Sequence, residues 1–359
     1  MSGAGDLGTA RASEAAATAG ASRRVSVIVP CRNERDHIEA FCASAAAQQL
    51  PPGWELEVLI ADGRSDDGTL ERLQALAGRD ARFTVIDNPG GIVSTGLNQA
   101  LARVRGEVVV RMDVHTRYAA DYIAQCLLAL QHSGADNVGG PWRAEGEGPM
   151  QRAIAAAFQS RWLAGGARSR QLDYNGWVDT VYLGCWPRAS LERFGGFDEQ
   201  LVRNQDDEHN LRIVKGGGRV WQSAAIRSSY RPRGSLGALF RQYLQYGYWK
   251  PFVMKKHGQA ASLRQLVPGL FVLALAVAAL LGALGAGWLP ALALLGLYGA
   301  AALGASVAIA AASGWSLAWR LPAVIAAYHF GYGIGSLWGW ADVLRGARTG
   351  RRRFARLTR

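Results

Sequence analysis

Acidic side chains and a histidine end apolar runs in the first third of the chain, where they could do chemistry together. The segment GEVVVRMDVHTRY, residues 106–118, passes through three valines and a methionine and then reaches Asp113 and His115. Residues i and i+2 of a β-strand point to the same face, so this carboxylate and this imidazole could converge on one ligand just past the strand. Asp62 ends an earlier apolar run, ELEVLIAD, in the same way.

The elements that must position these residues alternate along residues 25 to about 135. Apolar runs predict strands, and the intervening segments with helical spacing predict helices. In chain order these are strand 25–30, helix 35–50, strand 55–62, helix 65–78, strand 83–88, helix 94–106 and strand 107–113. Such alternation indicates βαβ units and a parallel sheet, whose ligands bind beyond the carboxyl ends of the strands. Asp62 and Asp113 would share that crevice.

The turn after the first strand, PCRNERD at residues 30–36, contains no glycine. A usual dinucleotide-binding fold places G-x-G-x-x-G there, so the sequence disfavours a dehydrogenase. Pro30, Arg32, Asn33 and Glu34 occupy this turn instead. Hydrogen-bonding side chains of this kind suit a base and a ribose better than a tightly held diphosphate.

The chain changes character at Leu266. Runs 266–288 and 289–313 carry no charge, and each is long enough to cross a bilayer, which takes about 20 residues. A third apolar run, 321–340, contains His329 and closely spaced glycines, so a buried core helix is a stronger alternative there. We therefore expect two or three apolar helices associated with a membrane.

The composition divides the chain into four parts. The protein has 359 residues with 49% hydrophobic and 19% charged, which argues against wholesale disorder. We expect a disordered tail at 1–22, an α/β domain at 23–257, a membrane-associated helical region at 258–344 and a polybasic tail at 345–359. That last tail carries seven arginines and no acid, which suits anionic lipid headgroups. Because no recognition helix accompanies it, we expect no nucleic-acid partner.

Five polar clusters occur in a characteristic order. They are PCRNE (30–34), ADGRSDDGT (61–69), RMDVHTRY (111–118), GGFDE (195–199) and NQDDEHNLR (204–212). Over residues 25–257 this order resembles glycosyltransferase family 2, which comprises inverting sugar-nucleotide enzymes. With RQYLQYGYWK (241–250) it is most similar to the branch that contains the succinoglycan glucosyltransferases. The resemblance implies a GT-A nucleotide-diphospho-sugar transferase domain, an α/β fold with a Rossmann-like mixed sheet, followed by C-terminal membrane helices.

The resemblance also implies a donor site. Pro30, Arg32 and Glu34 would surround the base and ribose, and Asp62 would accept a hydrogen bond from the uracil imide. A carboxylate accepting from a ring N–H is a charge-assisted hydrogen bond, which is the stronger kind.

The D-x-D motif of the family falls on Asp113-Val114-His115, so the second aspartate is replaced by a histidine. The resemblance implies that Asp113 and His115 hold a divalent cation, Mn²⁺ or Mg²⁺, that neutralises the departing diphosphate. Imidazole suits Mn²⁺ better than Mg²⁺, which favours manganese.

The base of the family is an aspartate in an E-D motif, and this motif falls on Gln205 and Asp206. Asp206 is therefore the expected base, and the adjacent Asp207 is its nearest competitor. Gln242 and Trp249 match part of the Q-x-x-R-W element of processive synthases and are expected to bind substrate. Gln245 stands where that element has arginine, and two or three helices are too few for a secretion pore. These departures favour a single-addition transferase.

The implied function is transfer of a hexose, glucose from UDP-glucose, to a polyprenyl-diphosphate-linked oligosaccharide at the cytoplasmic face of the inner membrane. The alternatives are another donor, such as GDP-mannose or UDP-galactose, a simple lipid acceptor, or a non-enzymatic nucleotide-binding membrane scaffold.

A cytoplasmic donor also implies a topology. The KKH segment at 255–257 and the arginine-rich tail both favour the inside, so the number of crossings should be even. Residues 266–288 and 289–313 are expected to cross as a hairpin. The third run would pack against that hairpin or lie at the inner surface.

Overall fold

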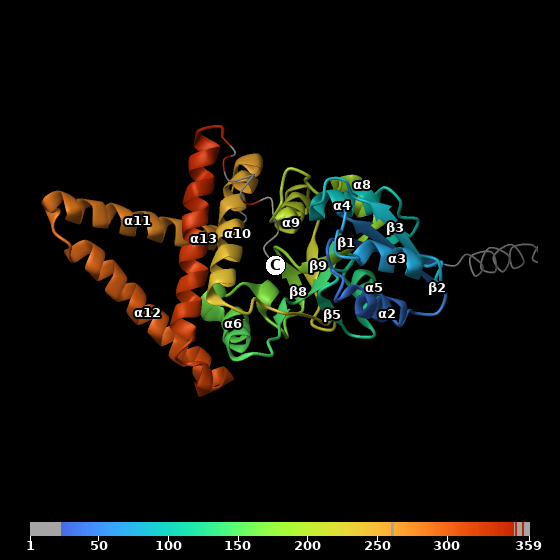
Figure 1. The fold of residues 1–359 in the computed structure, drawn as a ribbon, viewed down its shortest axis with the longest axis horizontal. Helices are drawn as coiled ribbons and strands as arrows, with labels where there is room; N and C mark the ends of the chain where they lie inside the picture. The colour runs from blue at the N-terminus through green and yellow to red at the C-terminus, as the bar shows by residue number, and fades with distance from the viewer. Residues whose placement is uncertain (1–22, 260–261, 348, 350–353, 355–359) are drawn as a thin grey trace, which may run out of the picture.

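The protein is seen in a computed structural model that describes residues 23–259, 262–347, 349 and 354. The expected tail at 1–22 and most of the polybasic tail lie outside the described residues. Figure 1 shows an α/β part at one end and a group of long helices at the other.

The α/β part is built on a mixed sheet of eight strands in the order β3-β2-β1-β4-β9-β6-β10-β8. The strands are β1 (Arg23–Cys31), β2 (Trp54–Asp62), β3 (Phe83–Asp87), β4 (Val108–Arg111), β6 (Asn137–Gly140), β8 (Gly176–Val178), β9 (Tyr182–Pro187) and β10 (Val220–Gln222). The first four are mutually parallel, as the alternating pattern predicts. Strand β9 runs antiparallel to both β4 and β6, which makes the sheet mixed.

Helices cover both faces of this sheet, so its strands are buried on both sides. They are α2 (Ile38–Ala46), α3 (Thr69–Ala77), α4 (Val93–Leu101), α5 (Tyr122–Ser133), α8 (Arg188–Phe194) and α9 (Gln205–Lys215). Val27 of β1 packs with α2, α3 and α5, whereas the next residue, Ile28, packs with α4, α8 and α9. This double burial explains why the strands read as continuous apolar runs. The expected helices 35–50 and 94–106 are shorter in the structure.

A second, small sheet stands beside the first. It has the order β5-β11-β7 and consists of β5 (Thr116–Tyr118), β11 (Ser228–Tyr230) and β7 (Arg143–Ala144). Helices α6 (Pro149–Gln159) and α7 (Arg161–Ala164) follow β7, with a short 3₁₀ turn at Arg168–Arg170. Aromatic and apolar residues of α6 pack against the helical region, so this corner joins the two parts of the molecule.

The helical region contains α10 (Leu236–His257), α11 (Val267–Leu281), α12 (Leu289–Ser313) and α13 (Leu321–Leu344). Short helical turns connect them at Leu263–Gln265, Gly282–Ala286 and Trp315–Leu317. In the described part of the chain, the helical stretches Leu263–Ala286 and Leu289–Ser313 are long and apolar enough to cross a membrane, with mean hydropathy 2.5 and 2.0. Both are mostly exposed, and Figure 1 shows them extending away from α10 and α13. A core helix of a soluble protein would instead be buried.

Helix α13, the third apolar run, lies along α10 (Figure 1). A Cβ at Gly335 would lie 2.2 Å from the carbonyl oxygen of Leu244, and one at Gly339 would lie 2.3 Å from that of Tyr248. Gly333 faces the other way and meets the carbonyl oxygen of Pro268 at the start of α11. The glycines therefore allow backbones to approach closely. The third run packs against α10 and α11, and its placement relative to the membrane stays a prediction.

Candidate active site

A cleft of about 1190 Å³ opens at the carboxyl ends of β1 and β4. It lies between the 30–37 turn, the 111–118 segment, the start of α9 and one side of α10. Of the site residues predicted from the sequence, the structure brings together at this cleft Pro30, Arg32, Glu34, Asp113, His115, Asp206 and Gln242. Asp62, Asp207 and Trp249 are not among the residues that line it.

Asp113 and His115 reach the cleft through a turn. Strand β4 ends at Arg111, and the amide of Thr116 donates to the carbonyl of Asp113 at 3.1 Å. The sequence predicted that strand alternation would place Asp113 and His115 on one face. That prediction is wrong, because the strand has already ended and a turn carries both residues. His115 is half-exposed, and its Nδ1 lies 3.7 Å from Oε1 of Glu34. The cleft thus joins the two clusters that the sequence separates by about 80 residues.

Arg111 is a site residue that the sequence analysis missed. Its guanidinium donates to both carboxylate oxygens of Asp113, at 3.0 and 3.1 Å, and its Nη1 is buried without a hydrogen-bond partner in the described part of the chain. Burial acts to lower the pKa of Arg111, but the charges of Asp113 and Asp206 outweigh it and raise that pKa. A charged residue inside the buried run VVVRMD was the available signal, because buried arginines are almost always paired.

The residues at this turn supply too few metal ligands to hold a cation by themselves, so a bound substrate would have to supply the others. Across the described residues, no group of three His, Cys, Asp or Glu side chains is arranged to hold a metal ion. Asp113 and His115 supply one carboxylate and one imidazole, and a carboxylate bonded to arginine keeps lone pairs for a metal. Cations that bind nucleotides typically take their remaining ligands from phosphate oxygens and water. The donor set is consistent with a cation of that kind.

The two adjacent aspartates of α9 face different surroundings. Asn204, in the left-handed region at φ 63°, precedes the helix, and Asp206 lines the cleft. Asp207 instead accepts from Nζ of Lys250 at 2.5 Å. Burial and the neighbouring charge of Asp207 raise the pKa of Asp206, with Arg111 and Lys250 acting in the opposite direction. Asp206 thus lines the cleft with a carboxylate whose pKa is raised.

Asp62 supports the first turn from beneath. It is 2% exposed, and its carboxylate accepts from the amide of Ser65 at 3.0 Å and from the Ser65 hydroxyl at 2.6 Å. The same hydroxyl accepts from the amide of Asn33 at 2.8 Å. Asp62 therefore holds the segment that presents Arg32 and Glu34.

Of the two residues of α10 that were expected to bind substrate, only Gln242 lines the cleft. Its Nε2 donates to the hydroxyl of Tyr230 at 3.2 Å. Trp249 is 2% exposed and packs with Leu201 and Val202, the residues just before the 203–206 segment. Its ring supports the loop that leads to Asp206.

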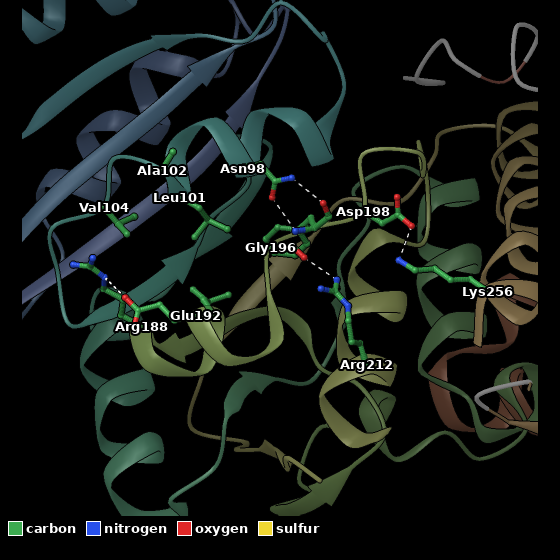
Figure 2. A pocket seen from close by; sticks show the side chains of 12 residues that line it. Asn98, Leu101, Ala102, Val104, Arg188, Glu192, Gly196, Asp198, Arg212 and Lys256 are labelled. Carbon is green, nitrogen blue, oxygen red and sulfur yellow. Dashed lines mark hydrogen bonds and ion pairs between the residues drawn. The ribbon is translucent and has the colours of Figure 1, made fainter. Parts of the chain in front are cut away.

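None of the GGFDE residues lines the cleft, and the cluster lies instead beside a separate hollow of about 650 Å³ between α4, α8 and α9 (Figure 2). Arg212 donates to the carbonyl of Gly196 at 2.7 Å, and Lys256 pairs with Asp198 at 2.7 Å. Both cations also bind Glu208. These contacts tie the loop, α9 and the end of α10 together, so the cluster fixes the helix that carries Asp206.

The fold and the cleft define a GT-A glycosyltransferase. A family model described as glycosyl transferase family 2 matches residues 26–194. The chain is 33% identical over 283 residues to the succinoglycan biosynthesis protein ExoA of Rhizobium meliloti, a match that covers 78% of this chain and 84% of that one. The protein therefore belongs to glycosyltransferase family 2.

Two further comparisons agree with this assignment. The chain is 25% identical over 240 residues to a dolichyl N-acetyl-α-D-glucosaminyl phosphate 3-β-D-2,3-diacetamido-2,3-dideoxy-β-D-glucuronosyltransferase of Methanococcus voltae, covering 65% of this chain and 74% of that one. Its fold is similar to that of a mannosyltransferase of Pyrobaculum calidifontis solved with GDP-Man and Mn²⁺, with a TM-score of 0.57 and 21% identity over 88% and 87% of the chains. This likeness confirms the predicted GT-A fold.

Proposed function

We propose that the protein transfers one hexose, glucose from UDP-glucose, with inversion to a polyprenyl-diphosphate-linked oligosaccharide in exopolysaccharide synthesis. The observation that carries the proposal is the cleft, in which Arg32, Glu34, Asp113 and His115 face the start of α9 and Asp206. A donor site and a base in one cavity suit group transfer and have no use in a binding scaffold. The relative that acts in succinoglycan biosynthesis supports the pathway class.

The donor's nucleoside would lie against the first turn. Arg32 already donates to the carbonyl of Gly91 at 3.2 Å, so its position is set. A carboxylate has lone pairs beyond those that Ser65 uses, and Asp62 would accept from the uracil imide with these. Because Asp62 is buried, that contact requires the 63–65 segment to move aside.

Asp206 would be the base. As the acceptor hydroxyl attacks the anomeric carbon, its proton passes to the Asp206 carboxylate, and the bond from that carbon to the diphosphate oxygen breaks on the opposite face. The raised pKa of Asp206 brings it closer to neutral pH, where a base is most effective. Asp207 would pair with Lys250 and would help to position the start of α9 without taking the proton itself.

Asp113 and His115 would hold a divalent cation together with the donor's diphosphate, and the cation would neutralise the charge of the leaving group. The imidazole ligand favours Mn²⁺ over Mg²⁺. Arg111 would keep the Asp113 carboxylate oriented by its two hydrogen bonds.

The acceptor would come from the membrane. The Methanococcus relative is named for transfer to a dolichyl N-acetyl-α-D-glucosaminyl phosphate, which supports a lipid-linked acceptor here. Helices α11 and α12 would cross the inner membrane as a hairpin, with the catalytic domain and the basic tail on the cytoplasmic side. An impermeant thiol reagent applied to intact cells, with a cysteine added after Arg359, tests this orientation.

Donor hydrolysis by the purified protein with UDP-glucose, UDP-galactose and GDP-mannose tests the donor. UDP-glucose should be hydrolysed fastest, and release of its nucleoside diphosphate should require Asp206. Faster hydrolysis of another sugar nucleotide would change the proposed donor. An absence of turnover with every donor and lipid acceptor would contradict the transferase activity.

A further inference from the structure

The C-terminal tail (345–359) returns to α10 and α13. Beyond Ala347 the structure describes Thr349 and Phe354, and Phe354 is 5% exposed. The centroid of its ring lies 4.9 Å from that of Tyr248 on α10 and 5.1 Å from that of Trp338 on α13. Chain termini are usually poorly ordered unless specific contacts tie them down. Phe354 therefore anchors the tail against both helices.

A second contact, polar in character, holds the same tail. The hydroxyl of Thr349 donates to the carboxylate of Asp342, at 2.8 Å from each oxygen, and accepts from Nε1 of Trp338 at 3.2 Å. Asp342 is 1% exposed, and it also accepts from the hydroxyl of Tyr248 at 2.7 Å. Because a buried carboxylate requires hydrogen-bond donors, Asp342 joins the tail to α10 and α13 independently of the Phe354 ring.

Phe354 belongs to an apolar cluster that continues to the helix of the proposed base. We call it the anchor cluster, and its buried members are Leu201, Val202, Leu211, Tyr248, Trp249, Val253 and Phe354. Leu201 and Val202 precede the 203–206 segment, and Leu211 lies on α9, which carries Asp206. The ring centroids of Tyr248 and Trp249 are 5.4 Å apart. Packed side chains therefore connect the tail with the segment that leads to the base.

The 203–206 segment depends on this packing for its position. It leads into the first turn of α9 and includes Asn204 in the left-handed region. Leu201 and Val202, just before it, are 4% and 5% exposed, so the side chains beneath them set the path of the chain. Protein interiors are close-packed, and removal of a buried ring leaves a cavity that the neighbours only partly fill. A displacement of about 1 Å at a catalytic group lowers a rate by about 100-fold.

We propose that Phe354 is a positioning residue for the base. Its ring supports the anchor cluster, which holds the 203–206 segment and so keeps Asp206 in place. Thr349 keeps the tail docked through Asp342. The inference rests on the proposed function, because the role of Phe354 is exerted through Asp206. The tail is then part of the catalytic structure, in addition to its expected contact with lipid headgroups.

The test uses the full-length protein in nanodiscs. Phe354→Ala removes the ring, and Phe354→Leu keeps much of its apolar volume. Thr349→Val removes the hydrogen bonds and keeps the shape, whereas Thr349→Ser keeps the hydroxyl. Leu344→Ala is the matched control, because Leu344 is 82% exposed at the end of α13 and has little packing to lose. Calorimetry gives the UDP affinity, and initial rates below the Tm of the least stable variant give kcat and KM.

Docking of the tail is measured without reference to catalysis. Trypsin cleaves after arginine, and the tail has arginines between Leu344 and Phe354. Because proteases cut locally opened segments, cleavage there should be about tenfold faster in Phe354→Ala and Thr349→Val than in the wild type and in Leu344→Ala. Equal cleavage rates in all four proteins would overturn the anchor.

Phe354→Ala should lower kcat by about tenfold or more and change UDP affinity by less than about twofold, because the base is displaced. Phe354→Leu should recover much of the rate. Thr349→Val should lower kcat in the same direction, and Thr349→Ser and Leu344→Ala should match the wild type. A loss of UDP affinity that accounts for the loss of rate would overturn the role assigned to Phe354.

A double-mutant cycle separates positioning of the base from general destabilisation. In Asp206→Asn the base is already absent, so adding Phe354→Ala should lower the remaining rate by less than about twofold. A further loss of about tenfold in that background would overturn the proposal, because independent effects multiply. If Phe354→Ala fails to fold, the same cycle with Thr349→Val decides the question. Wild-type protein that hydrolyses no sugar nucleotide would contradict the proposed function, whereas the trypsin comparison would still test the anchor.

Discussion

Lys250 of α10 and Asp207 of α9 form an ion pair of 2.5 Å, and this pair distinguishes two adjacent aspartates. Lys250 is 4% exposed, and Asp207 also accepts weakly from Thr180 at 3.5 Å. A carboxylate engaged in this way is held as a counter-ion. Asp206, one residue before it, faces the cleft and has the raised pKa.

Asp206→Asn should abolish transfer and retain donor binding, because it removes the base and keeps the shape of the side chain. We expect a fall in kcat of about 10²- to 10⁴-fold, the range that general bases contribute. Asp207→Asn should retain more of the activity. Initial rates and UDP titrations measure the two effects. Normal turnover in Asp206→Asn with a loss in Asp207→Asn would move the base by one residue.

Lys250→Met should change the pH profile. The charge of Lys250 lowers the pKa of Asp206, while the charge of Asp207 raises it. Without Lys250, the repulsion between the Asp206 and Asp207 carboxylates is still opposed by Arg111 but no longer by Lys250. The pKa of Asp206 should therefore rise. The acidic limb of the kcat/KM profile should then move to higher pH, because activity requires the ionised carboxylate.

The double variant Lys250→Met with Asp207→Asn is the control, since it removes both charges of the pair. Its acidic limb should return toward the wild-type position. An acidic limb that stays in place in Lys250→Met would show that the ion pair does not tune Asp206.

Activity should depend on a divalent cation and be higher with Mn²⁺ than with Mg²⁺. His115→Asp should narrow that preference, because it replaces an imidazole by an oxygen ligand. Transfer rates of the wild type and of His115→Asp, measured with Mn²⁺ and with Mg²⁺ after chelation and dialysis, give the metal preference of each protein. Full activity in excess chelator would contradict the roles proposed for Asp113 and His115.

The pattern of the first 113 residues was sufficient to predict the parallel half of the sheet, because both faces are covered and the strands are continuously apolar. The order of polar clusters likewise predicted most of the cleft. Turn residues at strand ends must converge wherever parallel strands are adjacent, so Arg32, Glu34 and Asp113 could be expected together without knowledge of side-chain contacts.

Contacts between distant segments could not be predicted in this way. Strand β9 inserts antiparallel between β4 and β6, and no local pattern encodes that partner. The pairing of Lys250 with Asp207 joins residues 43 positions apart. The close approach that the glycines of the third apolar run allow depends on the backbone of α10, which the sequence does not place beside them.

His209 should make the folded state less stable as the pH falls. Burial and the charge of Arg212 lower its pKa to about 4, whereas an exposed histidine titrates near 6.5. Between these values the unfolded chain binds a proton that the folded chain excludes, so stability decreases from pH 6.5 to 4. The expected loss is on the order of 3 kcal/mol.

Thermal unfolding of the wild type and of His209→Gln across this pH range measures the effect. The difference between their Tm values should change with pH, since only the wild type carries the titrating imidazole. Parallel Tm curves would contradict the assignment. Comparing slopes removes any constant cost of the substitution.

Gly335→Ala should separate α13 from α10. A Cβ there would lie 2.2 Å from the carbonyl oxygen of Leu244 and 2.9 Å from the amide nitrogen of Tyr248, and both are backbone atoms that cannot turn aside. Overpacking of this kind typically costs about 1–3 kcal/mol, which exceeds the gain of up to about 1 kcal/mol in helix propensity. We expect a lower Tm and a loss of transfer, because α10 carries Gln242 and Lys250.

Gly296→Ala is the matched control for that substitution. Gly296 lies in the apolar helix α12, and a Cβ added there would meet nothing within 4 Å. The same substitution should therefore leave Tm and activity unchanged or raise Tm slightly, through helix propensity alone. Equal effects at the two positions would show that α13 does not hold α10 by close packing. A loss confined to Gly335→Ala would establish that the third apolar run supports the catalytic cleft through the backbone of α10.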